Sequence, residues 1–171
     1  MLQAAGRRAL VLSGVAAALL AAGCASGPKP TFPVPRALEI SVQAAPGLNP
    51  DVRDRPTPVV LRIYELRSPV AFEAADFFTL FDKDQAALGN DIVGKEELQL
   101  RPGESAKLVR ELKPETRTVG VFAAFRDLER SRWRAVVALP DPPPPAPAPP
   151  PKPLGVPLKV TLGARDVQIA R

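Results

Sequence analysis

Histidine is absent from the 171-residue sequence. This absence removes the commonest general base and the commonest metal ligand, so Ser-His-Asp, Cys-His and histidine-containing zinc sites are excluded. No glycine-rich phosphate loop of a standard pattern is present. Carboxylate chemistry stays formally open, but the candidate pair Asp76 and Asp82 lies six residues apart and faces different sides of a helix. We therefore expect no enzyme, no cofactor and no bound metal.

Cysteine occurs once, as Cys24, so no disulfide can form within the chain. Arg7 and Arg8 precede an apolar run of about 12 residues, too short to cross a bilayer of roughly 30 Å. The small residues 21–23 lead directly to Cys24, a pattern that resembles the lipobox of bacterial lipoproteins. The lipobox usually has leucine three residues before the cysteine, whereas Leu20 stands four before it.

The lipobox resemblance implies a signal peptide over residues 1–23, cleavage after Gly23 and acyl chains on Cys24. Ala25 rather than aspartate follows, which by the same resemblance favours the outer membrane. The alternative is ordinary signal-peptidase cleavage, which would leave a soluble protein with a free thiol.

Charge of one sign is not concentrated anywhere in the chain. The formal net charge is +5, and it falls to about +3 once residues 1–23, with Arg7 and Arg8, are removed. No run of lysine and arginine with interleaved aromatics occurs, so we expect a mixed solvated surface and no nucleic-acid partner.

What the chain has is alternation of apolar and polar residues over short segments, which predicts half-buried strands. After a proline-rich tether at 24–36, residues 37–171 are expected to form one domain. Residues 98–101 and 106–112 flank Pro102-Gly103 and are expected to pair as a hairpin. The run 119–125 is apolar on both faces and predicts a central strand. The remaining expected strands are 38–42, 59–63, 133–139, 158–162 and 167–169, the last two forming a terminal hairpin. About eight short strands predict a mainly β, two-sheet antiparallel β-sandwich.

One segment breaks this alternation. Phenylalanines recur at spacings near three between Phe72 and Phe81, with Phe77 or Phe78 between them, and Ser68-Pro69 can start a helix. We expect the helix to cap an open end of the sandwich with its aromatic face. The alternative is an exposed aromatic docking site around Phe77 and Phe78.

Two loops are unusually long or unusually composed. Residues 44–57 join the first two strands with 14 mostly polar residues, whereas hairpin loops usually have two to five. The loop is expected either to dock a partner or merely to stay soluble, and substitutions in it are expected to leave stability almost unchanged. Residues 141–153 include nine prolines and predict polyproline II. This segment is either a ligand for an aromatic groove or a tolerated insertion between strands that still pair.

Several stretches resemble one known family. They are LNPD (48–51), PTPVVLRIYELRS (56–68), AF (71–72), ADFFTLFD (75–82), GVFAAFRD (120–127) and WRAVV (133–137). In this order behind a lipobox, they resemble TssJ (SciN), the outer-membrane lipoprotein of the type VI secretion system. The resemblance covers about residues 37–139, and the proline-rich insertion is not part of the family pattern.

The resemblance implies a transthyretin-like sandwich with an added helical element at about 69–84, and no catalytic activity. It further implies that the loop between the first two strands docks the periplasmic C-terminal region of TssM, an inner-membrane protein that binds TssL. The residues expected to contact this partner are Leu48, Asn49, Pro50, Asp51, Arg53, Asp54 and Arg55. A rival hypothesis is a periplasmic carrier that holds a small apolar ligand between the sheets, beside small residues such as Ala123 and Ala135.

Overall fold

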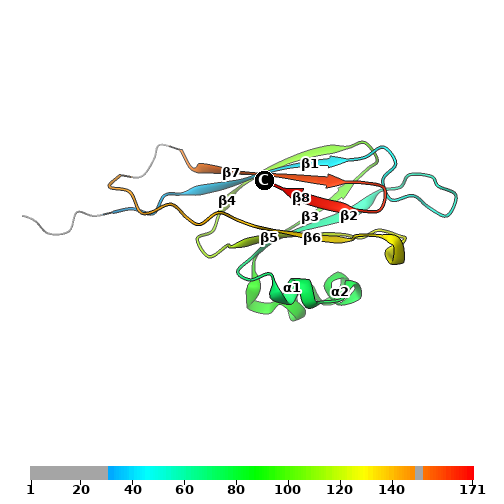
Figure 1. Cartoon of the computed structure of the whole chain (residues 1–171), viewed down its shortest axis with the longest axis horizontal. Coiled ribbons are helices and arrows are strands. Elements are labelled where there is room, and N and C mark those ends of the chain that lie inside the picture. Colours follow the sequence, from blue (N-terminus) through cyan, green and yellow to red (C-terminus); the bar gives the residue numbers. More distant parts are fainter. Residues whose placement is uncertain (1–30, 149–151) are drawn as a thin grey trace, which may run out of the picture. The chain divides into compact units, whose positions relative to one another are not determined.

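Two four-stranded sheets face each other in the computed structural model, which describes residues 31–148 and 152–171 (Figure 1). The first sheet has the order β4-β1-β7-β8 and the second the order β3-β2-β5-β6. The strands are β1 (Arg36–Ala44), β2 (Val59–Leu66), β3 (Ile92–Leu100), β4 (Ser105–Leu112), β5 (Thr118–Ala123), β6 (Arg134–Ala138), β7 (Leu154–Leu162) and β8 (Val167–Ala170). The predicted mainly β sandwich is thus confirmed, and among the strands of the described residues only β1 and β7 pair in parallel.

The predicted hairpin across Pro102-Gly103 is wrong, because β3 pairs with β2 and β4 pairs with β1. The turn crosses from one sheet to the other, with Gly103 at φ 78°. Its backbone N–H donates to the carbonyl of Ala45 at 3.1 Å, which ties the turn to the end of β1. Alternation cannot separate the two arrangements, since Leu100 and Leu108 point into the same core in either case.

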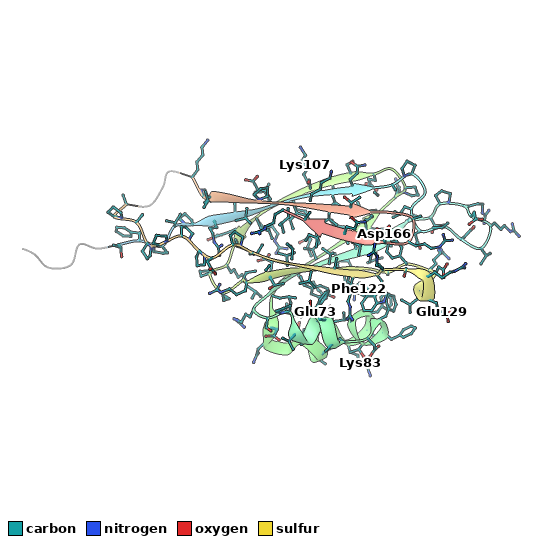
Figure 2. The ribbon with its side chains drawn as sticks, in the orientation of Figure 1. Glu73, Lys83, Lys107, Phe122, Glu129 and Asp166 are labelled. Carbon is teal, nitrogen blue, oxygen red and sulfur yellow. The ribbon has the colours of Figure 1, made fainter. Side chains whose placement is uncertain are left out.

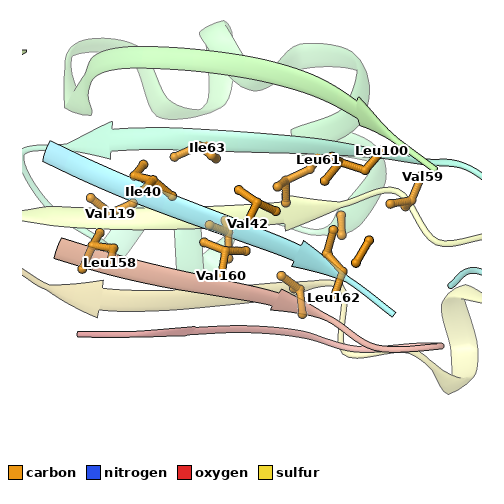
Figure 3. Packing of buried hydrophobic residues seen from close by; sticks show 14 of the residues in the cluster. Ile40, Val42, Val59, Leu61, Ile63, Leu100, Val119, Leu158, Val160 and Leu162 are labelled. Carbon is orange, nitrogen blue, oxygen red and sulfur yellow. The ribbon is translucent and has the colours of Figure 1, made fainter. Parts of the chain in front are cut away.

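The core lies between the sheets and is made of the inward residues of both (Figure 3). Ile40, Val42, Leu158 and Val160 come from the first sheet, and Leu61 comes from the second. β5 is buried along its whole length, as its apolar run predicted. The terminal hairpin of β7 and β8 is likewise confirmed.

The helical segment covers the outer face of the second sheet and does not cap an end of the sandwich (Figure 1). It consists of α1 (Val70–Ala74) and α2 (Phe77–Leu88), separated because Asp76 caps α2 by accepting the Thr79 N–H at 2.9 Å. Phe72, Leu80 and Leu88 pack against outward residues of the sheet, including Tyr64 and Phe122.

Gly120 allows this close approach of helix and sheet. A Cβ atom at this position would lie 2.9 Å from the Phe72 ring. Below the same helices, the Tyr64 hydroxyl and the Lys95 ammonium both donate to the carboxylate of Asp84, at 2.8 and 2.9 Å. In the part of the chain described, neither helix combines the length and apolarity needed to span a bilayer.

Candidate functional site

The β1–β2 loop, residues 45–58, joins strands of different sheets and is therefore not an overlong hairpin. Its base is organised around Asn49, which is 3% exposed and adopts φ 46°, a left-handed conformation that asparagine tolerates. The Asn49 side chain donates to the carbonyl of Pro58 at 2.7 Å and accepts the N–H of Arg126 at 2.8 Å. The Asn49 backbone N–H also donates to the carbonyl of Ala164. Asn49 thus joins the loop to two distant turns, to one through its side chain and to the other through its backbone N–H.

Two residues that were expected to contact a partner are therefore in the interior. Leu48 is fully buried in the sandwich core, and its carbonyl accepts the N–H of Thr57 at 3.0 Å. Asn49 uses both ends of its amide within the chain. Leu48 and Asn49 hold the loop in place but present no side chain to a partner in this conformation, which corrects that part of the expectation.

Asp51 organises the loop tip, which we define as residues 50–55. One carboxylate oxygen accepts the backbone N–H groups of Arg53 and Arg55, at 2.8 and 3.0 Å. The other oxygen receives Nε and Nη2 of Arg55, at 2.8 and 2.7 Å. These hydrogen bonds, from the Arg55 side chain first and then from the two backbone N–H groups, lower the pKa of Asp51 to about 2. The carboxylate is ionised at neutral pH and keeps the tip folded.

The tip presents Val52, Arg53 and Asp54 to solvent, and Val52 is completely exposed. Val52 lies between two charged residues, and its side chain is not buried against any part of the described chain. A single exposed apolar side chain is ordinary on a protein surface, so the significance of Val52 depends on the charged groups and the hollow beside it.

Beside the tip lies an open hollow of about 650 Å³. Its floor and far wall are the turn after β5, including the short helix η2 (Leu128–Arg130), and Arg165 in the β7–β8 turn. Glu129 and Asp166 of these two turns lie at the same end of the sandwich (Figure 2). The hollow is lined by Pro50, Asp51, Val52, Asp54, Arg126, Asp127, Arg130 and Arg165.

Charges in the hollow are partly neutralised. Asp127 accepts Nε of Arg130 at 2.9 Å and Nε of Arg165 at 3.0 Å. Desolvation acts to raise the pKa of Asp127, but the hydrogen bonds and charges of Arg130 and Arg165 lower it below its usual value. The Arg126 guanidinium forms no ion pair among the described residues and donates only to the Thr57 hydroxyl, at 3.1 Å. The hollow therefore offers a positive charge to a partner.

Sequence reasoning missed the residues that complete this surface: Arg126, Asp127, Arg130 and Arg165. A signal existed for the first two, because they end the GVFAAFRD stretch that supports the family resemblance. Nothing in the sequence places Arg165 beside the loop tip, since that contact depends on the arrangement of the two sheets.

The aromatic helix divides into a buried and an exposed part. Phe77 packs against Phe122 and Trp133, with ring centroids 5.0 and 5.4 Å away. Phe122 points from the sheet toward the helices (Figure 2). Phe78 is 64% exposed and could serve as the secondary contact expected from the sequence, whereas Phe77 could not without unpacking.

The other candidate roles gain no support from side-chain positions. Asp76 caps α2, and within the described ranges no three potential ligands gather to hold a metal ion. Ala123 and Ala135, the small residues of the carrier hypothesis, pack in the sandwich core and line neither of the hollows at its two ends. Cys24 lies outside the described residues.

Comparison with known proteins identifies the relatives of this chain. Residues 36–165 match a family model described as type VI secretion lipoprotein, VasD, EvfM, TssJ. Comparison with curated proteins gives no match. Among solved structures, the chain is similar to the lipoprotein TssJ1 from Pseudomonas aeruginosa, with 39% identity, a TM-score of 0.69, and 80% of this chain and 95% of that chain covered.

Two further solved structures are similar. Lip from Serratia marcescens, a membrane-bound component of the type VI secretion system, is 25% identical, with a TM-score of 0.69, and 81% of this chain and 98% of Lip are covered. A chain of a type VI membrane complex is also 25% identical, with a TM-score of 0.64, and 80% of this chain and 98% of that chain are covered.

Proposed function

We propose that this chain, which belongs to the type VI secretion lipoprotein family that includes TssJ (SciN), joins the outer membrane to the periplasmic part of the secretion membrane complex. Acyl chains on Cys24 hold it in the outer membrane. The loop tip and the adjoining hollow dock the periplasmic C-terminal region of a TssM-like inner-membrane protein, and through it TssL.

The observation that carries the docking proposal is the internal folding of the loop tip around Asp51. Both carboxylate oxygens are used within the tip, by two backbone N–H groups and the Arg55 guanidinium. A loop that is ordered before it binds loses less conformational entropy on binding. The exposed Val52 can then enter an apolar site on the partner while Arg53 and Asp54 form polar contacts around it.

The chemistry of the hollow supports the same assignment. A partner that reached past Val52 would meet Arg126, whose charge no carboxylate of the described chain neutralises. An acidic side chain of the partner fits this position, and a charge-assisted hydrogen bond there is roughly twice as strong as a neutral one.

The distance between the loop and the tether supports separate roles for them, docking for the loop and membrane attachment for the tether. β1 begins at Arg36, directly after the tether, and ends at Ala44, where the loop begins. Nine residues of strand at about 3.3 Å each separate the two ends by roughly 30 Å. Figure 1 shows the loop and residues 32–36 at opposite ends of the sheets. A protein docked on the loop would be held away from the membrane surface.

The test is isothermal titration calorimetry of the mature chain carrying Cys24→Ser against the C-terminal periplasmic region of TssM. The double variant Val52→Asp, Arg53→Glu should bind at least tenfold more weakly, because hot-spot side chains typically contribute about 2 kcal/mol or more. Its melting temperature should be unchanged, since both side chains are exposed.

A matched control changes the same residue types outside the loop. Val109 is 72% exposed on β4, and Lys107 projects from the outer face of the first sheet (Figure 2). The variant Val109→Asp, Lys107→Glu should keep the affinity of the unsubstituted chain. Equal affinity of the loop variant and the unsubstituted chain would remove the loop tip from the interface.

A further inference from the structure

The end of the sandwich opposite the β1–β2 loop carries an apolar surface that the docking proposal does not use. We call it the tether end. It includes an open hollow of about 250 Å³. Most of its lining is apolar, from Pro140, Pro143, Leu154, Val156 and Pro157, and the charged residues Arg36, Asp141 and Arg171 complete it. Leu154 is 52% exposed, and Phe32, at the same end, is 43% exposed. Large apolar side chains that remain exposed together mark an interaction site more often than scattered ones do.

Backbone hydrogen bonds hold the tether and the proline-rich segment side by side. Phe32 and Ala146 exchange both of their N–H···O bonds, at 2.8 and 2.9 Å. The N–H of Leu154 donates to the carbonyl of Pro35 at 2.8 Å, and the guanidinium of Arg36 donates to the carbonyl of Pro140. The exposed apolar groups are therefore fixed to the domain where the chain leaves it (Figure 1).

Chain length decides what can reach this surface. Phe32 follows Cys24 by eight residues, and eight residues span at most about 28 Å even when fully extended. Acyl chains on Cys24 would place that residue at the edge of the bilayer. The tether end would then always lie within that distance of the lipid headgroups, whereas the loop tip is a further roughly 30 Å away along β1.

We propose that the tether end rests on the bilayer surface, with Phe32 and Leu154 inserted between the headgroups and the adjoining hollow facing the lipid. The inference rests on the proposed lipidation of Cys24 for the nearness of the membrane. The domain is then held at two points, the acyl chains and its own apolar end. Contact at two points orients β1 away from the bilayer and directs the loop tip into the periplasm.

The proline-rich segment gains a role from this arrangement. Proline rings carry no N–H group, so a surface built from Pro140, Pro143 and Pro157 has few donors to desolvate when it meets lipid. Amphipathic surfaces of this kind bind at the headgroup boundary with a strength that scales with the apolar area buried. Because most of the exposed lining is apolar, and Asp141 offsets part of the positive charge of Arg36 and Arg171, the contact should depend little on salt.

The test measures partition of the mature Cys24→Ser chain onto vesicles of phosphatidylethanolamine and phosphatidylglycerol at millimolar lipid by co-sedimentation. The chain has no acyl group in this assay, so the result does not depend on whether Cys24 is lipidated in cells. The variant Phe32→Ser, Leu154→Ser should partition at least tenfold more weakly than the unsubstituted chain. Circular dichroism checks that both are folded.

The matched control is Phe78→Ser, which removes an apolar group that is 64% exposed on α2, outside the tether end. It should partition within twofold of the unsubstituted chain, and raising the salt from 0.1 to 0.5 M should change little. The proposal is overturned if the unsubstituted chain does not sediment with vesicles, if Phe32→Ser, Leu154→Ser sediments equally, or if the control loses as much. A dimer that only Phe32→Ser, Leu154→Ser abolishes, without vesicle binding, would assign the surface to a second copy instead.

Discussion

The two ends of the sandwich are ordered by different means. At the loop end, polar side chains order the backbone. The side chains of Asn49 and Asp51 bind six groups of the loop and its neighbours. At the tether end, proline fixes the backbone torsion itself, and hydrogen bonds mostly between backbone groups, such as the bridge between Phe32 and Ala146, align the two segments. The first end is polar and charged, and the second is apolar.

The difference shows how one fold can present two unlike surfaces without changing its core. Polar side chains order a loop by using part of their hydrogen-bonding capacity within the chain. The charged side chains that stay exposed in such a loop suit a protein partner. Prolines order a segment without adding a polar side chain or an N–H donor, and the rings that remain exposed suit lipid. The predictions below test each end against the other.

The largest effect is expected from the residue before the tether end. Cys24→Ser should move the protein from the outer-membrane fraction to the soluble periplasm, because stable anchoring needs two or more acyl chains. The apolar tether end alone would give only reversible contact. Fractionation with immunodetection measures this, and Ala25→Ser is the neighbouring control that should stay membrane-bound. An unchanged outer-membrane fraction for Cys24→Ser would contradict lipidation.

At the loop end, Asn49→Ala should lower the free energy of unfolding by about 2–4 kcal/mol. The substitution leaves the carbonyl of Pro58 and the N–H of Arg126 without these partners, at about 1–2 kcal/mol for each part-buried group. Alanine is also strained at the left-handed φ of 46°. Urea denaturation measures the change. Arg53→Ala, at the exposed tip, should stay within about 0.5 kcal/mol, and equal losses in the two variants would contradict a structural role for Asn49.

Asn49 also shows where the sequence stops being informative. The length and the polar residues of the loop located it in the sequence, but they did not distinguish its buried residues from its exposed ones. Burial of Asn49 depends on Arg126 and Ala164, which are 77 and 115 positions away in the sequence and reach the loop only when both sheets are in place. Local composition cannot reveal such contacts, and they are the reason why a substitution of Asn49, unlike one at the exposed tip, is now expected to lower stability.

The strands were predictable for the opposite reason. A strand that buries one face must alternate, so residues 38–42 and 59–63 could be recognised without knowledge of their partners. Pairing is a different matter, because a turn such as Pro102-Gly103 can close a hairpin or cross between sheets with the same alternation on both sides. The flanks of the proline-rich segment illustrate the same limit: β6 and β7 were expected to pair but lie in different sheets.

A smaller, local effect is expected when Asp51 is protonated. Its pKa is lowered from 3.8 to about 2, so the stabilisation of the tip by the carboxylate is fully present above pH 4 and is lost as the pH falls toward 2. The amide resonances of Arg53 and Arg55, whose N–H groups bind this carboxylate, should titrate with a midpoint near 2. In Asp51→Asn they should not move over this range. A midpoint near 3.8 would show that the tip is not folded around Asp51.

The smallest effect on stability is expected from shortening the proline-rich segment. Replacing residues 141–153 by a Gly/Asn turn of about five residues still spans the roughly 10 Å between sheets. Loop closure changes by only about 0.6 kcal/mol per doubling of length, so the free energy of unfolding should change by less than about 1 kcal/mol. Affinity for the TssM region should be kept, because the segment lies at the end opposite the loop tip. Vesicle partition should fall, because Pro143 and the bridge to Phe32 are lost.

A Gly/Ser replacement of residues 141–153 at full length separates length from stiffness. If proline rings supply the apolar surface, this variant should lose vesicle partition as the shortened one does, while its stability also stays within about 1 kcal/mol. A loss of TssM affinity by tenfold or more in either variant, with the fold intact by circular dichroism, would instead make the segment a recognition element and would end the separation of tasks between the two ends.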